Sequence, residues 1–146
     1  NPQWRDLESG AEALVIFHGP HAYISPSWYP STREHGRMVP TWNYEVVHVY
    51  GRARCIHEPQ ELLPLLRALT EQHERGRPQP WSVDDAPPDF IEATARAVVG
   101  FEIPIERIEG KAKMSQNRSE ADREGAREGL RQGGAAERAV AERIFD

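Results

Sequence analysis

The stretch from Phe17 to Tyr50 restricts the possible folds more than any other part of the chain. It holds seven of the twelve aromatic residues and four of the six histidines. Two extended segments can be recognised in it, around residues 22–28 and 39–50, and a connection rich in proline, serine and glycine joins them. Their Trp, Tyr, His, Asn and Ser side chains combine flat apolar area with hydrogen-bonding tips. They suit either a β-core with polar tips or a wall against a planar polar ligand.

Strict alternation in the second segment would place its side chains on two opposite faces of one strand. One face would carry Trp42, Tyr44, Val46, His48 and Tyr50, and the other Thr41, Asn43, Glu45, Val47 and Val49. Gly51 then predicts a bulge or a sharp bend, which a sheet needs when it curls into a barrel.

Elsewhere the pattern predicts short strands mixed with helices, which indicates a mainly β fold with flanking helices, of the α+β class. We expect a buried strand at 13–17 that Gly19-Pro20 ends or bulges, a polar loop at 30–36, and a half-exposed strand at 101–108. We expect helices at 59–74, 89–99 and 135–145, with a further one running from Ser119 toward Gly129. Pro64 favours a short turn and a helix that begins at Pro64, and Gly100 favours a C-terminal cap. Ser119 and Asp122 fit a capping box.

Composition excludes several classes of protein. The net charge of -5 argues against a nucleic-acid-binding surface spread over the whole domain. The single cysteine, Cys55, predicts no internal disulfide, and its place in an expected strand favours a small buried hydrophobe over a nucleophile. No apolar run approaches the length of a membrane span and no signal peptide is visible, so we expect a cytoplasmic protein.

A cluster of polar side chains lies between residues 111 and 118. In a strand, Lys111, Lys113, Ser115 and Asn117 would share one face, with Gln116 and Arg118 at the junction with the next helix. Donors that converge on a helix N-terminus suit a phosphate or carboxylate. The same pattern also fits an exposed basic strand end followed by an ordinary helix cap, and the residues leave both interpretations open.

The histidines give weaker signals. His18 and His21 span a Gly-Pro bend and lack the partner spacing of a metal site. His48, on the aromatic face, could bond a ligand or satisfy a core partner. No nucleophile elbow, P-loop or dinucleotide fingerprint is present.

Several long motifs, taken together, resemble the PaiB family, whose members are described as FMN-binding negative transcriptional regulators. They are residues 19–29 (GPHAYISPSWY), 39–44 (VPTWNY), 47–51 (VHVYG) and 113–118 (KMSQNR), with further similarity at 68–74, 80–87 and 100–104. The resemblance implies an FMN-binding split β-barrel of Greek-key type. The expected barrel domain covers residues 1–118, with inserted helices at about 59–74 and 89–99. Residues 119–146 are expected to form a helical segment packed on the barrel. Family members carry a stretch before Asn1 that supplies the first strands, and we expect these strands to be lacking here.

The resemblance also implies a homodimer with FMN at the subunit interface. The expected polar ligands are Lys113, Ser115, Gln116, Asn117 and Arg118, and the expected pocket lining is Tyr23, Ser25, Trp42, Asn43, Tyr44 and His48. No helix-turn-helix pattern is visible, so the sequence does not support direct DNA binding, and regulation would be indirect or act through a partner. Two alternatives stay open: a flavin-dependent oxidoreductase that uses NAD(P)H, and a split barrel that binds haem or a metal through His18, His21 or His48.

Overall fold

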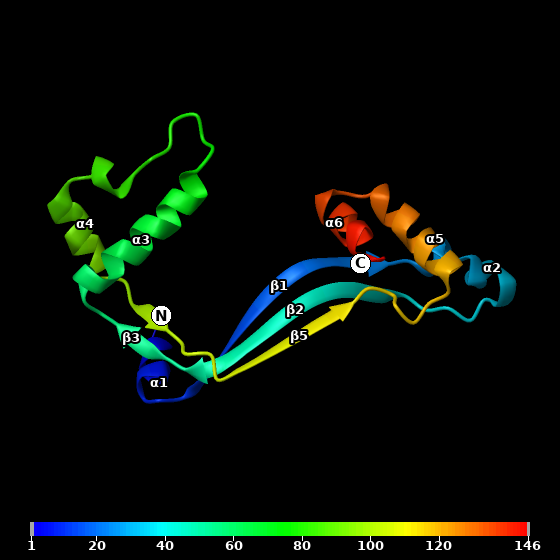
Figure 1. Cartoon of the computed structure of the whole chain (residues 1–146), viewed down its shortest axis with the longest axis horizontal. Helices are drawn as coiled ribbons and strands as arrows, with labels where there is room; N and C mark the ends of the chain where they lie inside the picture. The colour runs from blue at the N-terminus through cyan, green and yellow to red at the C-terminus, as the bar shows by residue number, and fades with distance from the viewer. Residues whose placement is uncertain (1, 146) are drawn as a thin grey trace. The chain divides into compact units, whose positions relative to one another are not determined.

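The computed structural model describes residues 2–145, which form two compact units (Figure 1). Of these residues, 2–13 and 50–106 make up the first unit, and 14–49 and 107–145 make up the second. The elements follow one another along the chain as α1 (Trp4–Glu8), β1 (Glu12–Ile24), α2 (Pro30–His35), β2 (Thr41–Arg52), β3 (Arg54–Ile56), α3 (Pro59–Glu74), α4 (Pro88–Ala95), β4 (Gly100–Glu102), β5 (Arg107–Lys113), α5 (Glu120–Arg131) and α6 (Ala135–Arg143), with short 3-10 helices at Pro26–Trp28 and Val83–Asp85.

The first unit is built on an antiparallel pair of short strands, β3 and β4, in which Cys55 lies opposite Phe101. Leu62 of α3 packs against this pair: a Cβ on Gly100 would lie 2.5 Å from Leu62 Cδ2. Gly100 is the first residue of β4, and its lack of a side chain permits this close packing. The prediction that Gly100 caps the C-terminus of a helix is therefore wrong. The preceding helix, α4, already ends at Ala95.

Helix α3 runs without interruption through Pro64 and begins at Pro59, so the predicted start at Pro64 is wrong. Proline inside a helix leaves the carbonyl four residues earlier without its amide donor. Gln60, which carries that carbonyl, and Pro64 are both exposed, so water can take the place of the donor. Pro59 occupies the first helical position, where the missing N–H costs nothing.

Gly51 and Cys55 lie in the strands of this unit. A Cβ on Gly51 would lie 2.1 Å from the carbonyl oxygen of Pro104, so the glycine allows two backbones to approach closely. Strand β2 continues through Gly51 and ends at Arg52. Cys55 is partly buried, and burial together with the Glu8 carboxylate raises the pKa of its thiol. The raised pKa agrees with the prediction that Cys55 is no activated nucleophile.

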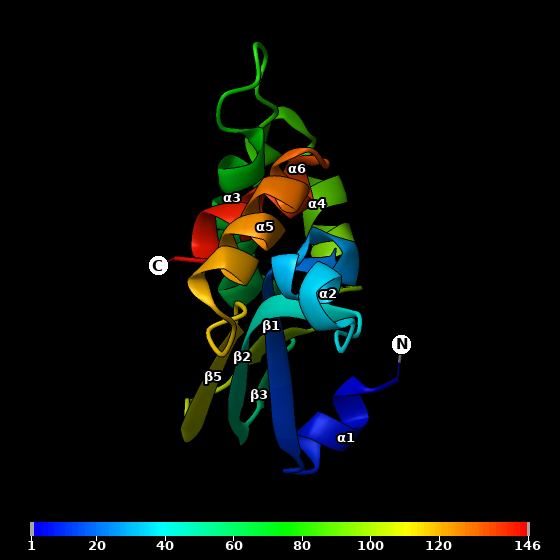
Figure 2. The ribbon, with the colours of Figure 1, turned by 90° about the vertical axis from the view of Figure 1, so that its right-hand side faces the viewer.

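The second unit contains a three-stranded sheet in the order β1-β2-β5, whose neighbouring strands run in opposite directions (Figures 1 and 2). Together with the β3–β4 pair and the helices, this sheet makes a mixed α+β fold, as predicted. The segment 101–108, predicted as one strand, is divided at 103–106 between β4 and β5, which belong to different sheets. The closed form of a split barrel and the boundary after residue 118 stay predictions.

Helices α5 and α6 pack together and cover one end of the sheet in this unit (Figure 2). The core between them contains buried apolar side chains from β1, the segment after it, the residue after β5, and both helices with the residue after α6: Ala22, Ile24, Tyr29, Met114, Ala126, Leu130, Val140, Ala141 and Ile144. Val140 of α6 and Ile144, which directly follows that helix, are four residues apart and both buried.

Residues 30–36, predicted as a polar loop, contain helix α2 over Pro30–His35. Pro30 occupies its first turn, and Gly36 ends it in the left-handed conformation with φ 67°. Both are recognised helix-boundary residues, so the signal was present in the sequence. The polar composition of the segment concealed it.

Asp122 joins α5 to α2. Ser119 Oγ accepts a hydrogen bond from the Asp122 amide at 3.2 Å, as in the predicted cap. The Asp122 carboxylate does not complete the capping box: it accepts hydrogen bonds from the Ser31 amide at 3.1 Å and from Ser31 Oγ at 2.7 Å. Burial alone would raise the pKa of Asp122, but the hydrogen bonds from Ser31, with smaller effects of Ser119 and the Arg118 charge, together hold the pKa below its usual value.

Asp122→Asn is expected to lower the free energy of unfolding by about 1–3 kcal/mol near neutral pH, because the amide cannot accept both bonds from Ser31. A depressed folded-state pKa stabilises the fold above the unfolded pKa of about 3.9, and this stabilisation is lost as the pH falls through the lower folded value. The gap between wild type and variant should therefore shrink below about pH 4. Urea unfolding of wild type and Asp122→Asn, from neutral pH to below pH 4, measures this difference in unfolding free energy. Asp84→Asn, which changes an exposed aspartate, is the control. A gap independent of pH would contradict the role of the charge.

Among the described residues, no helix combines the length and apolar character that crossing a membrane requires.

Candidate functional site

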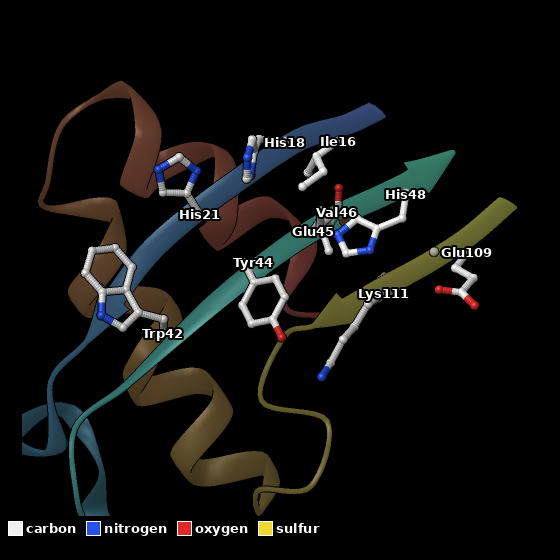
Figure 3. Close-up of a pocket in the computed structure, with 11 residues that line it drawn as sticks. Ile16, His18, His21, Trp42, Tyr44, Glu45, Val46, His48, Glu109 and Lys111 are labelled. Carbon is white, nitrogen blue, oxygen red and sulfur yellow. The ribbon is translucent and has the colours of Figure 1, made fainter. Parts of the chain in front are cut away.

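An open groove of about 980 Å³ lies on one face of the three-stranded sheet in the second unit (Figure 3). Its lining comes from all three strands: Ile16, His18 and His21 of β1, Trp42, Tyr44, Glu45, Val46 and His48 of β2, and Glu109, Gly110 and Lys111 of β5. The volume lies within the range of small-molecule and cofactor sites. Figure 3 shows the helices behind the sheet and the Trp42, Tyr44 and histidine side chains on the opposite face.

The alternation of β2 sets this face. Trp42, Tyr44, Val46 and His48 line the groove, which are the first four members of the face that the sequence predicted. The other face carries buried Asn43 and Val49.

In β1 the alternation shifts by one residue. Ile16 and His18 line the groove, and the next residue of the strand to do so is His21. This shift is what a bulge at Gly19-Pro20 produces, so the strand continues through the dipeptide with one extra residue. A Cβ on Gly19 would lie 2.8 Å from Glu45 Cβ, and glycine therefore allows the close contact with β2. The bulge turns His21 toward the groove.

Aromatic side chains give the groove its flat apolar surface. Trp42 is 53% exposed, so its indole is accessible to a partner. Tyr23 meets the indole edge-on, with ring centroids 6.1 Å apart and planes at 75°. The His21 ring lies 6.4 Å from the same indole at 38°. Contacts on two sides restrict the orientation of Trp42 while its ring stays accessible.

Charges in the groove are mixed. The Lys111 ammonium lies 5.7 Å from the centroid of the Tyr44 ring, within cation–π distance. Glu109 adds a carboxylate to the lining, whereas the Glu45 carboxylate lies 4.0 Å from Arg143 of α6, on the face that the helices cover. Lys111 is the lining residue best suited to an anionic group, and the three histidines can donate or accept hydrogen bonds to a polar ring.

The structure brings Tyr23, Trp42, Tyr44 and His48 together, but Asn43 lies elsewhere. Asn43 is fully buried on the opposite face of β2. Its Nδ2 donates to Ser115 Oγ at 3.0 Å, and the Ser115 hydroxyl lies 3.2 Å from Asn43 Oδ1. Ser115 holds this position at φ 63°, a conformation unusual for a residue other than glycine. The buried pair connects β2 to the turn before α5, and the sequence could not show which partner each polar group would find.

The predicted polar ligands are dispersed around that turn. Lys113 Nζ donates to Thr41 Oγ1. The Gln116 side chain accepts from the Met114 amide at 2.7 Å and donates to the Ala112 carbonyl at 3.0 Å, so both of its ends are engaged locally.

The two remaining predicted ligands flank the start of α5. Arg118 stacks over the Tyr29 ring at 5.4 Å and donates to Met38 Sδ at 3.6 Å. Asn117 is exposed. The first turn of α5 contains Glu120 and Asp122, whose charges oppose an anion there. Of the two interpretations of this segment, the arrangement favours an ordinary helix cap.

Ser25, also predicted in the pocket, caps the 3-10 helix Pro26–Trp28. Its Oγ accepts from the Ser27 amide at 3.3 Å and lies 2.8 Å from Ser27 Oγ. The lining residues that sequence reasoning did not assign to a flavin pocket are Ile16, His18, His21, Glu45, Val46, Glu109, Gly110 and Lys111. The spacing of His18 and His21 was the available signal, because a Gly-Pro bulge between them returns the second histidine to the same face.

Comparison with known proteins identifies a family for this chain. A family model described as "Putative FMN-binding domain" matches residues 1–107. The chain is 46% identical over 122 residues to "Protease synthase and sporulation protein PAI 2" of Bacillus subtilis (strain 168), a match covering 84% of this chain and 56% of that protein. It is 38% identical over 135 residues to "Uncharacterized protein AN0679" of Emericella nidulans, covering 85% of this chain and 54% of the relative.

The chain spans about half the length of the curated relatives it matches. The motifs at 19–29, 39–44, 47–51 and 100–104, on which the resemblance partly rests, lie inside the matched range. The match and the relatives confirm the resemblance to the PaiB family, and the chain belongs to the FMN-binding domain family.

Proposed function

We propose that this chain binds FMN in the groove of the three-stranded sheet, as part of a PaiB-type flavoprotein. The observation that carries the proposal is the exposed Trp42 ring, which is positioned by Tyr23 and His21 in a groove of about 980 Å³. A flavin needs stacking area for its ring system, donors for its polar edge and a cation for its phosphate. The family to which the chain belongs supplies the class of ligand.

The lining residues fit these needs unequally. Trp42 and Tyr44 offer ring area for the isoalloxazine, and His18, His21 and His48 offer nitrogen atoms along its edge. Lys111 would face the phosphate, whereas Glu109 would repel it. When bound, FMN would supply electron-transfer chemistry, and the protein would contribute orientation, exclusion of water and hydrogen bonds to the ring.

Trp42→Ala is expected to weaken FMN binding by about tenfold, because a stacking partner is worth on the order of 1–3 kcal/mol. Titration of FMN with protein, followed by flavin fluorescence, measures the affinity. Trp81→Ala is the matched control, since Trp81 is 46% exposed and lies in the first unit. Equal affinities for both variants would contradict the proposed site.

Lys111→Gln tests whether Lys111 contacts the phosphate of FMN or its ring system. The variant should lose affinity for FMN a few-fold while its affinity for riboflavin, which lacks the phosphate, stays unchanged. A loss of equal size for both ligands would show that Lys111 contacts the ring. No change for either would remove Lys111 from the site.

We also propose that the flavoprotein is a homodimer. The strands of the second unit expose apolar side chains on both faces of the sheet: Leu14 47%, Ile16 44%, Phe17 58%, Val47 37% and Ile108 61%. Apolar surface of this extent on a small domain is typical of an interaction surface. Sedimentation-velocity ultracentrifugation should show a concentration-dependent species of twice the 16.6 kDa monomer mass. A monomer at all concentrations, with and without FMN, would contradict the dimer.

The PaiB resemblance implies a regulatory role, and we propose that this role is exercised in the cytoplasm, indirectly or through a protein partner. The net charge of -5 disfavours direct DNA contact. Adding NADH or NADPH to the FMN-loaded protein without oxygen tests the oxidoreductase alternative. Bleaching of the flavin absorbance would favour an enzyme, and an unchanged spectrum would favour binding or sensing.

A further inference from the structure

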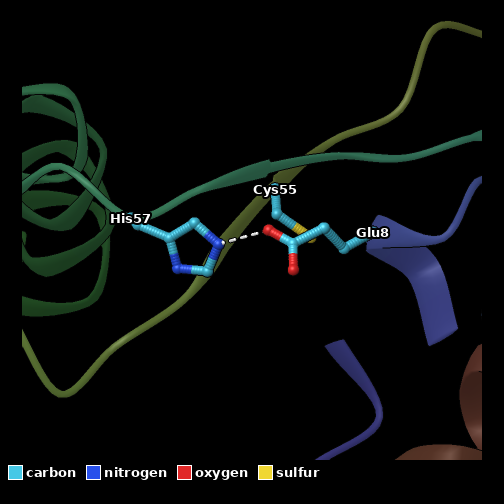
Figure 4. A group of neighbouring side chains, drawn as sticks. All are labelled: Glu8, Cys55 and His57. Atoms are coloured by element: carbon cyan, nitrogen blue, oxygen red, sulfur yellow. Dashed lines mark hydrogen bonds and ion pairs between the residues drawn. The ribbon is translucent and has the colours of Figure 1, made fainter. Parts of the chain in front are cut away.

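Three side chains with metal-ligand chemistry meet in the first unit (Figure 4). Glu8 is the last residue of α1, Cys55 is the central residue of β3, and His57 directly follows that strand. Figure 4 shows the Glu8 carboxylate beside the Cys55 sulfur and facing the His57 ring. All three lie outside the groove of the three-stranded sheet, and the flavin proposal does not involve them.

The potential ligand atoms are already close to the spacing of a metal site. One ligand atom from each of the three residues lies within 4.8 Å of the others, and His57 Nε2 lies 2.9 Å from Glu8 Oε1. Bond lengths of about 2.0–2.3 Å put the ligand atoms of a tetrahedral zinc site roughly 3.3–3.8 Å apart. Side-chain rotations that move the ligand atoms by about an ångström would reach this spacing without a change of the backbone.

Local packing positions the cluster. Helix α1 packs against β3, and the Cys55 thiol donates to the Trp4 carbonyl at 3.6 Å. The Trp4 ring meets the His57 ring edge-on, with centroids 5.3 Å apart and planes at 78°. The short helix thus supplies both a ligand, Glu8, and the aromatic ring that orients His57. Such support around a ligand is common in metal sites.

An ion can reach this position from solvent. The side chains of His57 and Glu8 are 43% and 50% exposed, and Cys55 is partly buried behind them. Three protein ligands on one side and solvent on the other leave a fourth position for water, the arrangement of an open zinc site. An exposed ion pair such as Glu8–His57 contributes only about 0–1 kcal/mol to stability. Stabilisation by this pair therefore does not account for the position of the Cys55 thiol beside it.

We propose that Glu8, Cys55 and His57 bind one divalent transition-metal ion, with zinc as the best match. Sulfur, imidazole nitrogen and carboxylate oxygen together suit borderline ions such as Zn²⁺ and Co²⁺, whereas Mg²⁺ and Ca²⁺ require oxygen ligands. This differs from the metal alternative at His18, His21 and His48. Among the described residues, the Glu8–Cys55–His57 cluster is the group with three ligand atoms close enough to share an ion.

Cobalt titration tests the proposal directly. Co²⁺ alone is added to the reduced, chelator-treated full chain, and the near-ultraviolet thiolate-to-cobalt absorption is recorded. Because Cys55 is the only cysteine in the sequence, this band can arise from no other residue. We expect saturation at one Co²⁺ per chain and displacement of the band by an equivalent of Zn²⁺.

Variants of each ligand give the decisive comparison. Cys55→Ser should abolish the band, and His57→Gln and Glu8→Gln should each weaken Co²⁺ binding at least about tenfold, since even residues that merely support a ligand cost about 10–100-fold. His73→Gln and Asp6→Asn, which change an exposed histidine and an exposed acid of the same unit, are matched controls and should bind as wild type does. Far-UV circular dichroism checks that each variant is folded.

Three results would overturn the assignment. They are the absence of a cobalt–thiolate band in the folded wild type, a band that keeps its affinity in both His57→Gln and Glu8→Gln, and saturation at one Co²⁺ per two chains. The last would show that the thiol binds metal between two molecules rather than within one.

Discussion

Gly125→Ala is expected to destabilise the protein by about 2 kcal/mol, even though alanine is the better helix former. Alanine in the interior of α5 would gain about 1 kcal/mol in helix propensity. Its Cβ, however, would lie 2.1 Å from the Trp28 carbonyl oxygen and 3.2 Å from Pro30 Cδ. The first contact is with backbone, which cannot rotate away, so the helix must move and open its packing. The steric term should exceed the propensity gain.

Urea unfolding followed by far-UV circular dichroism measures this difference. Gly110→Ala is the control, because a Cβ there meets no atom within 4 Å, and its stability should stay within about 0.5 kcal/mol of wild type. A Gly125→Ala protein as stable as wild type would show that α5 does not pack against the Trp28 segment as described.

Leu130→Ala should cost more, about 2–5 kcal/mol, because it empties space in the centre of the same core. The Leu130 side chain is 0% exposed and packs in one cluster with Ala126 of its own helix and Val140 and Ile144 of α6. These neighbours are fixed on two helices, so the cavity can close only in part. Loss of the packing between α5 and α6 is the expected structural result.

Thermal and urea unfolding of Leu130→Ala should show the loss, with Leu65→Ala for comparison. Leu65 is 53% exposed on α3, and its truncation should change stability by no more than about 0.5 kcal/mol. If the two variants were equally destabilised, the buried position of Leu130 would be wrong.

The sequence predicted those features that depend on local periodicity. Alternation along β2 assigned Trp42, Tyr44 and His48 to one face, and this face lines the groove. It also assigned Asn43 to the opposite face, where the structure places it. Asn43 was expected in the pocket because of its polar side chain, although the alternation of β2 placed it on the other face. Periodicity was the better guide to position.

Contacts between distant segments could not be predicted in this way. Gly125 and Gly129 form a notch in α5 that receives Trp28: a Cβ on Gly129 would lie 2.3 Å from the indole. The pairing of Asp122 with Ser31 spans 91 positions. The meeting of Glu8 with Cys55 and His57 depends on where α1 packs. Periodicity within one segment contains no information about such partners.

Mapping the position of bound FMN tests the central claim most directly. In ¹H–¹⁵N correlation spectra recorded during an FMN titration, we predict that shifted amides cluster at residues 16–21, 42–48 and 109–111, which line the groove. Amides of the first unit should stay unchanged. Shifts confined to residues 113–122 at the start of α5, or saturation with no shifts in the groove, would contradict a flavin bound on the sheet.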